Sequence, residues 1–193
     1  MSSSTKVVTT LLGLAFAAGV SAAPVTYEID PAHTYPSFEA DHSGGMSVWR
    51  GKFNSSAGKI TFDKAASAGT VEVTIDMKSI DFGHQGLNDH ANTPDIFDTA
   101  KYPTATYSGK LAGFANGAPT KVEGNLTMHG VTKPVTLTIN TFKCAPDRSG
   151  REKCGADAVT TLNREDFGVT FGKAFGFDMK VTLRIQVEAL AAS

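Results

Sequence analysis

Residues 180–190 read KVTLRIQVEAL, a stretch in which apolar and polar residues alternate. The odd-numbered positions from Val181 to Ala189 are apolar, whereas the even-numbered positions from Lys180 to Glu188 are polar or charged. Successive side chains of an extended chain point to opposite faces, so this period of two predicts a strand with one buried and one wet face. A strand of this kind is typical of an antiparallel sheet.

The same alternation recurs along the chain. It is clearest in TVEVTIDM, KVEGNLTM and PVTLTINTF, at residues 70–77, 121–128 and 134–142. Turn signals such as ANGAP and HGVTKP separate further predicted strands, which cover 25–30, 34–41, 51–63, 103–113 and 155–162. The stretch HQGLNDHANTPDIFD (84–98) lacks the alternation, and we expect a loop there with one or two short helical turns.

Eight or nine strands in one sheet leave two exposed edges unless the sheet closes on itself. Closure into a barrel removes both edges, so we predict an all-β fold, an extended antiparallel barrel of eight strands with the short helical loop around 84–98. A sandwich of two sheets is the alternative. The sequence shows no internal repeat and no low-complexity linker, which indicates a single domain.

The N-terminus has the features of a secretory signal peptide over residues 1–22. Lys6 precedes an apolar run at 7–20, and small residues follow it up to a predicted cleavage after Ala22. A membrane anchor is the alternative, but a spanning helix needs about 20 apolar residues and this run is shorter. We therefore expect export to the periplasm and a mature domain at 23–193.

Charge excludes some classes of partner. The chain carries 18 basic and 19 acidic residues, and losing Lys6 with the signal peptide leaves 17 basic residues and a net charge of -2. A nearly neutral chain gives no electrostatic reason to expect nucleic acid or an anionic membrane surface as the partner.

The two cysteines, Cys144 and Cys154, flank a polar segment between two predicted strands. In an oxidising compartment such a pair favours a disulfide, here at the base of a long hairpin loop. A redox or metal role is the alternative, although the spacing differs from C-x-x-C.

Five segments in order resemble the YceI-like family of secreted bacterial proteins. They are YEIDPAHTYPSFEADHSG (27–44), VTIDMKSID (73–81), NDHANTPDIFDTAKYPTATYSG (88–109), GNLTMHGVTKPVTLTI (124–139) and CGADAVTTLNREDFG (154–168). Thr34 stands where the family usually has serine, and Ala91 stands where a leucine is common.

The resemblance implies a lipocalin-like barrel that binds a long isoprenoid lipid, such as a polyprenyl chain or a quinone tail, with no agreed reaction and no cofactor. It also suggests a membrane b-type cytochrome as a partner; the barrel itself would be a monomer or a homodimer. The candidate wall of the ligand site comprises Phe38, Phe53, Phe62, Val73, Ile75, Phe97, Tyr107, Leu126, Phe167, Phe171 and Phe175. Aromatic residues in a barrel more often form a solid core, which is the alternative for this set.

Two polar residues complete the predicted site. His33 is either a polar group near the barrel mouth or a turn-fixing hydrogen bonder after Asp30. Arg164 could neutralise an anionic head group, or it could pair with Glu165, with Asp166 or with a neighbouring strand.

No arrangement of residues predicts catalysis or a metal. His33 and His42 are nine residues apart and face opposite sides of one uninterrupted strand, so they could not share a metal there. No G-x-S-x-G or H-E-x-x-H motif occurs. We therefore expect a lipid carrier first, an enzyme acting on an isoprenoid second, and an accessory protein of the cytochrome third.

Overall fold

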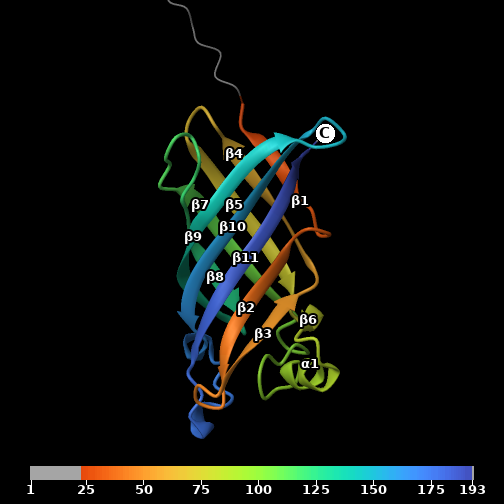
Figure 1. The fold of residues 1–193 in the computed structure, drawn as a ribbon, viewed down its shortest axis with the longest axis vertical. Helices are drawn as coiled ribbons and strands as arrows, with labels where there is room; N and C mark the ends of the chain where they lie inside the picture. The colour runs from red at the N-terminus through yellow and green to blue at the C-terminus, as the bar shows by residue number, and fades with distance from the viewer. Residues whose placement is uncertain (1–22, 193) are drawn as a thin grey trace, which may run out of the picture.

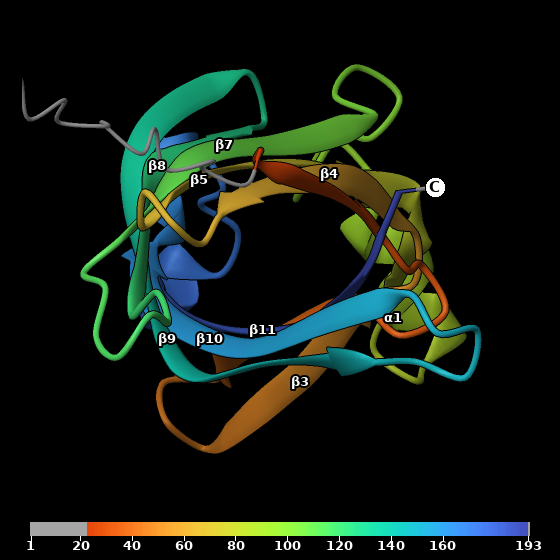
Figure 2. The same ribbon diagram turned by 90° about the horizontal axis from the view of Figure 1, so that it is seen from above.

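The computed structural model describes residues 23–192, and its strands form one antiparallel sheet that closes into a barrel (Figures 1 and 2). Ser193 and the predicted signal peptide at 1–22 lie outside the described residues. The closed ring contains β1 (Val25–Ile29), β4 (Ser56–Asp63), β5 (Ala68–Asp76), β7 (Thr104–Ala112), β8 (Lys121–Met128), β9 (Val131–Pro146), β10 (Glu152–Asn163) and β11 (Lys180–Ala191). The predicted eight-stranded antiparallel barrel is confirmed.

Three further strands lengthen the barrel: β2 (Tyr35–His42), β3 (Ser47–Phe53) and β6 (Ile80–Asp81). β11 pairs first with β2 and then, nearer its own end, with β1, so β1 and β2 occupy successive parts of one strand position. β4 and β3 continue each other in the same way, as do β5 and β6. The extended shape of the barrel follows from these three doubled positions.

The prediction of one continuous strand at 51–63 is wrong. β3 begins earlier, at Ser47, and the chain leaves the ladder at Asn54 before β4 starts. The Asn54 N–H donates to the carbonyl of Ser79, and its side-chain amide donates to Asp81. Asn54 is therefore held by a segment 25 residues later in the chain, and alternation alone does not reveal such a break.

The short helix expected within 84–98 is α1 (Gln85–Ala91). His84 caps it, because its Nδ1 accepts a hydrogen bond from the N–H of Leu87. Ala91 is completely buried in a cluster with Phe38 and Val181, so a small residue fits at the point where the helix meets the barrel. Three single-turn 3₁₀ helices complete the fold: η1 (Met77–Ser79), η2 (Arg164–Phe167) and η3 (Lys173–Phe175).

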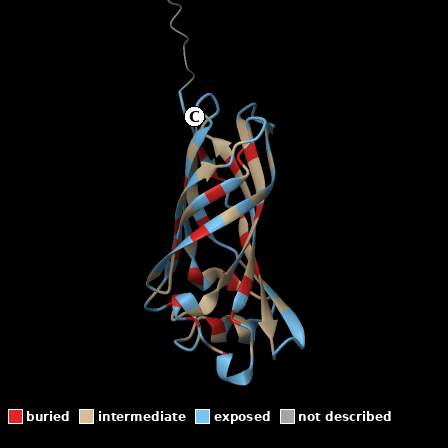
Figure 3. Ribbon diagram, turned by 90° about the vertical axis from the view of Figure 1, so that its left-hand side faces the viewer, coloured by how far each residue is buried: buried red, intermediate tan, exposed pale blue. Residues whose placement is uncertain are grey.

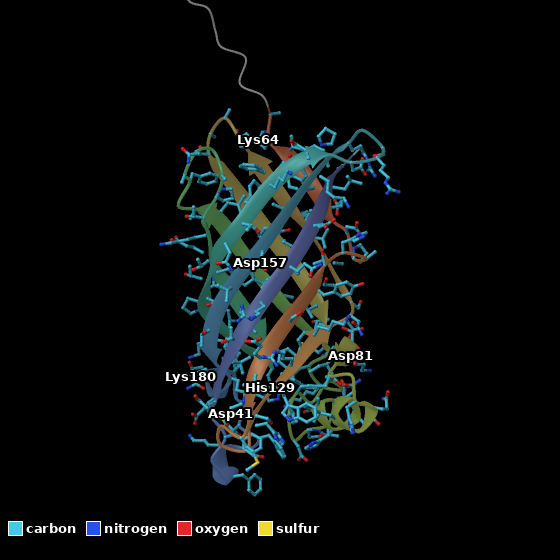
Figure 4. The ribbon with its side chains drawn as sticks, in the orientation of Figure 1. Asp41, Lys64, Asp81, His129, Asp157 and Lys180 are labelled. Carbon is cyan, nitrogen blue, oxygen red and sulfur yellow. A yellow bond between two sulfur atoms is a disulfide. The ribbon has the colours of Figure 1, made fainter. Side chains whose placement is uncertain are left out.

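The two ends of the barrel differ, and we name them by what they carry. The disulfide end contains the bond between Cys144 and Cys154, which confirms the predicted bridge and joins directly opposed residues of β9 and β10. The loop end contains α1, η2, η3 and the turn between β2 and β3 (Figure 1). Figure 4 labels Lys64 at the disulfide end and Asp41 at the loop end.

Burial follows the predicted alternation, with buried residues spaced along the strands rather than continuous (Figure 3). In β5, for example, Val71 is 8% exposed whereas its neighbours Thr70 and Glu72 are exposed or half-buried. Within the described part of the chain, no helix has both the length and the apolar character needed to cross a membrane.

Candidate functional site

The barrel encloses two adjoining cavities. The inner chamber, of about 130 Å³, lies towards the disulfide end, and the outer chamber, of about 340 Å³, lies towards the loop end. They meet at a shared waist whose side chains line both chambers: Pro36, Ile75, Leu126, Leu183 and Ile185. The inward faces of the strands therefore surround a lengthwise apolar space, and they do not fill it as a solid core.

The lining of the inner chamber is almost entirely apolar. Phe62, Val73 and Tyr107, all predicted as wall residues, line it together with other apolar side chains. The Tyr107 hydroxyl of β7 donates to main-chain carbonyls on the next two strands of the sheet, that of Val122 on β8 at 3.1 Å and that of Val135 on β9 at 2.8 Å. Burial raises the pKa of Tyr107 to about 12, so the phenol stays neutral and its polar atom is turned into the wall.

Glycines keep both chambers hollow. Gly124 lies beside Tyr107, and a Cβ built there would come within 2.8 Å of the Tyr107 ring. Gly51 lies directly opposite Phe38 across the β2–β3 pair, and a Cβ there would come within 2.5 Å of Cζ of Phe38. Because these positions lack side chains, the two rings lie against the wall instead of projecting across the lumen.

The outer chamber is lined with aromatic side chains. Phe53 contacts both Phe38 and Phe97, with ring centroids 5.9 and 6.4 Å apart, and all three line the chamber as predicted. Phe171 also lines it, next to His90 at 4.7 Å between ring centroids. This wall brings together β2, β3, the α1 segment and the loop before η3.

Five polar residues line the outer chamber: Ser37, Asp41, His42, His90 and Arg164. Half-buried Arg164 donates to the carbonyls of Val169 at 3.1 Å and Phe171 at 2.6 Å, and burial lowers its pKa. Among the ion pairs of residues 23–192, Glu165 pairs with Lys173 and none joins Arg164 to a carboxylate, so the predicted pairing with Glu165 or Asp166 is wrong.

The Asp41 carboxylate ties two loops together. It accepts hydrogen bonds from the N–H groups of Gly44 at 3.1 Å, Gly45 at 2.6 Å and Asp178 at 2.9 Å. The bond from Asp178 is the largest cause of a lowered pKa for Asp41. The carboxylate is thus ionised, and its oxygens already accept main-chain hydrogen bonds. The other residues that line the chamber are mostly apolar.

Comparison with known proteins identifies the family. A family model described as the YceI-like domain matches residues 27–189. The chain belongs to the YceI-like family. A UPF0312 protein of Pseudomonas aeruginosa is 35% identical over 161 residues, which are 82% of this chain and 83% of that protein.

Solved structures share the YceI-like barrel. Burkholderia cenocepacia BcnA aligns with a TM-score of 0.68 at 26% identity, covering 83% of this chain and 99% of BcnA. A structure described as a polyisoprenoid binding domain from Saccharophagus degradans aligns with a TM-score of 0.61 at 16% identity, covering 87% of this chain and 99% of that one. At that identity the second likeness is one of fold.

Three of the predicted site residues lie away from the YceI-like cavity. His33 is on the outer surface, where its Nδ1 is 2.7 Å from Asp30, so the turn-fixing interpretation holds and the mouth interpretation does not. Phe167 is 1% exposed and packs in the core under η2, and neither chamber includes it in its lining. Phe175 is 73% exposed on η3 and points to solvent.

Sequence reasoning missed several lining residues. Leu183 and Ile185 belong to the alternating face of β11, so extending the candidate wall to every inward strand position would have found them. Trp49 lies within β3, before the predicted strand at 51–63, and Phe177 lies in a loop. Both rings contact His42, at 5.4 and 5.3 Å between ring centroids. No periodic signal in the sequence marks those two residues.

Asp30, His33 and Glu188 are the one group of possible metal ligands among residues 23–192. Lys153 already lies among them, with Nζ at 3.4 Å from Asp30 and 2.9 Å from Glu188. The ammonium supplies the positive charge that the two carboxylates need, and the hydrogen bonds that it donates to Glu188 and Asp30 raise the pKa of Lys153. We interpret the cluster as an outer-surface ion-pair network that joins β1, β10 and β11.

Proposed function

We propose that this YceI-like protein binds a long isoprenoid lipid in its barrel and carries it without changing it covalently. The observation that carries the proposal is the adjoining pair of chambers, lined almost entirely by apolar side chains and joined at the Ile75 waist. The outer chamber alone, at about 340 Å³, falls within the ~300–1,000 Å³ range of small-molecule sites. A narrow chain that lies through the waist would use both chambers.

Length favours a chain over a compact ligand. β10 contains 12 residues, so at about 3.3 Å per residue and a tilt of about 40° it spans roughly 30 Å along the barrel axis. Burial of about ten methylene equivalents contributes roughly 8 kcal/mol before association costs, whereas one neutral hydrogen bond adds about 1 kcal/mol. In this proposal, affinity comes mainly from burial of the apolar tail of the ligand. A polyprenyl chain or a quinone tail meets that requirement.

The polar groups of the outer chamber suit a ligand head better than catalysis. Arg164 and Asp41 already make main-chain hydrogen bonds, which position loops and leave few free donors or acceptors for acid or base chemistry. The Ser37 hydroxyl donates to the carbonyl of Tyr35. His42 and His90 are the other polar residues of the chamber lining, and we propose that they face the head of the lipid.

The setting that we propose is the periplasm, after removal of residues 1–22. The barrel shape that is shared with the polyisoprenoid binding domain of Saccharophagus degradans supports the ligand class. The membrane b-type cytochrome partner and the choice between monomer and homodimer stay predictions.

Organic extraction of the purified protein, followed by mass spectrometry, tests the proposal. We expect one long isoprenoid lipid per barrel, recovered unchanged after incubation at working temperature. A matched control is the same protein unfolded, stripped of lipid and refolded, which should take up an added isoprenoid again. An empty barrel that takes up no isoprenoid would contradict the carrier proposal, and a lipid converted during incubation would favour an enzyme.

A further inference from the structure

Exposed apolar side chains gather at the loop end. Met46 is 84% exposed in the turn after β2, Val48 is 52% exposed in β3, and Phe175 is 73% exposed on η3. The only other large apolar side chain in the exposed class within residues 23–192 is Val25, 38% exposed at the start of β1 near the disulfide end. Single exposed apolar residues are ordinary, but three at one end form a surface that needs an explanation.

The two loops that carry these side chains lie side by side. A Cβ built on Gly44, in the turn after β2, would come within 3.2 Å of the carbonyl oxygen of Gly176, in the loop before β11. Asp41 joins the same two loops through its bonds to Gly45 and Asp178. Both loops also stand at one end of the elongated barrel (Figure 1). Met46 and Phe175 are therefore presented together, on loops that one carboxylate connects.

The exposed surface continues into the cavity. The ring of Phe175 lies 6.4 Å from that of Phe171, centroid to centroid, and Phe171 lines the outer chamber. An apolar route thus leads from the solvent-exposed loop tips to the interior of the barrel.

We propose that the loop end docks on the surface of a lipid bilayer, with Met46 and Phe175 inserted among the acyl chains. The bilayer is both the anchor and the source of the apolar ligand, which then enters the outer chamber without crossing water. The docking itself stands on the exposed side chains, and only the passage of the ligand rests on the proposed function.

A bilayer fits these side chains better than a protein partner does. Stable protein interfaces bury about 1,200–2,000 Å² in total, and three side chains on two loop tips offer only a small part of that area. A bilayer accepts such narrow, protruding tips without shape complementarity.

Charge at the loop end is mixed. Lys173 is paired with Glu165, and Lys180 lies two residues from Asp178. We therefore expect docking by apolar insertion, with little dependence on anionic lipid.

Flotation of the mature protein with phosphatidylcholine vesicles tests the docking. The double variant M46S/F175S should lose at least about tenfold in vesicle partition, because moving each of these side chains from water into hydrocarbon changes partition by roughly tenfold or more. The matched control V25S replaces the exposed apolar residue at the opposite end and should float like the unmodified protein. Replacing a third of the lipid by phosphatidylglycerol should change partition less than the double variant does.

Three outcomes would overturn the docking: equal flotation of all variants, flotation that needs phosphatidylglycerol and ignores M46S/F175S, or a dimer in solution that M46S/F175S dissolves. Uptake of an isoprenoid delivered in detergent is measured in parallel. M46S/F175S should keep that uptake while transfer from vesicles slows at least about tenfold. If the unmodified protein floats but takes up no isoprenoid, the proposed function fails and the docking stands.

Discussion

The two ends of this barrel belong to the same sheet but are held together by different interactions. At the disulfide end, the Tyr27 hydroxyl donates to Glu152, Lys64 pairs with the same carboxylate, and the Cys144–Cys154 bond lies beside them. The disulfide end is therefore held by a covalent bond and paired polar groups.

The loop end has no such covalent closure among the described residues. Its outer chamber is walled by loops and by aromatic rings that meet at 5–6.5 Å between centroids, and its tips expose Met46 and Phe175. The disulfide end therefore provides stability, whereas the loop end provides access to the cavity. Substitutions at the two ends and between them test this division.

The largest effect is expected at the waist between the ends. Ile75→Asp places an unpaired carboxylate where both chambers meet. A bound tail would remove water from that carboxylate, which costs several kcal/mol of binding free energy. Lipid retention, measured by native mass spectrometry, should fall at least about a hundredfold. The control is Thr74→Asp, one residue earlier on the outer face of β5, which should retain lipid. Equal retention by two folded variants would show that the ligand does not pass the waist.

Reduction of the disulfide should lower the stability of the fold without releasing the bound lipid. Closing a loop with a sequence separation of 10 residues contributes about 2–3 kcal/mol to the free energy of unfolding. Adding a thiol reductant should therefore lower the denaturation midpoint, while lipid stays bound under native conditions. The double variant C144A/C154A should show the lower midpoint and no response to reductant. Loss of lipid on reduction without any loss of stability would contradict the division between the ends.

Filling a wall glycine should narrow the outer chamber. Gly51→Ala forces the Phe38 ring away from the wall and into the lumen, at a cost of about 1–2 kcal/mol in stability. Gly155→Ala is the matched control, because it adds the same methyl group on the outer face of the barrel, beside Glu188, with its nearest neighbours at 3.6 Å or more. Thermal melts and isoprenoid titrations of both variants measure the effect. A loss of affinity as large for G155A as for G51A would refute a special role for the Phe38 contact.

The smallest effect is expected from chelation. Dialysis against a chelator should leave the melting temperature and the lipid content unchanged, since Lys153 supplies the cation at the Asp30 and Glu188 carboxylates. Lys153→Met tests the same cluster from the other side and should lower the melting temperature only slightly, because ion pairs that water reaches contribute little to stability. A stoichiometric transition metal that survives purification would contradict our interpretation.

Local patterns predicted the barrel, because side-chain alternation within a strand needs no information from elsewhere in the chain. Val73 belongs to the alternating face of residues 70–77, whereas Phe38 and Tyr107 were assigned to the wall by residue type, and the structure places all three along the cavity. The wall glycines were missed although their positions follow from strand pairing, since Gly51 has meaning only once Phe38 is known to lie opposite.

The loop end was harder to predict, because contacts between distant segments place its residues. Phe175 was grouped with the wall by residue type, yet the left-handed backbone at Gly172 and Gly176 turns its loop outward. His33 was left between two roles that only its distance from Asp30 could separate. The break at Asn54 likewise depends on Ser79 and Asp81, and no pattern within 51–63 contains them.

The Asp41 carboxylate gives the loop end a definite response to acid. Its pKa is lowered in the folded protein, so the stability that its bonds provide is present above the unfolded value of 3.8 and is lost only as the pH falls through the lower, folded value. Mild acidification therefore leaves the three N–H groups of the two loops in place. The connection that Asp41 makes between the turn after β2 and the loop before β11 should therefore persist through mild acidification and be lost only in strong acid.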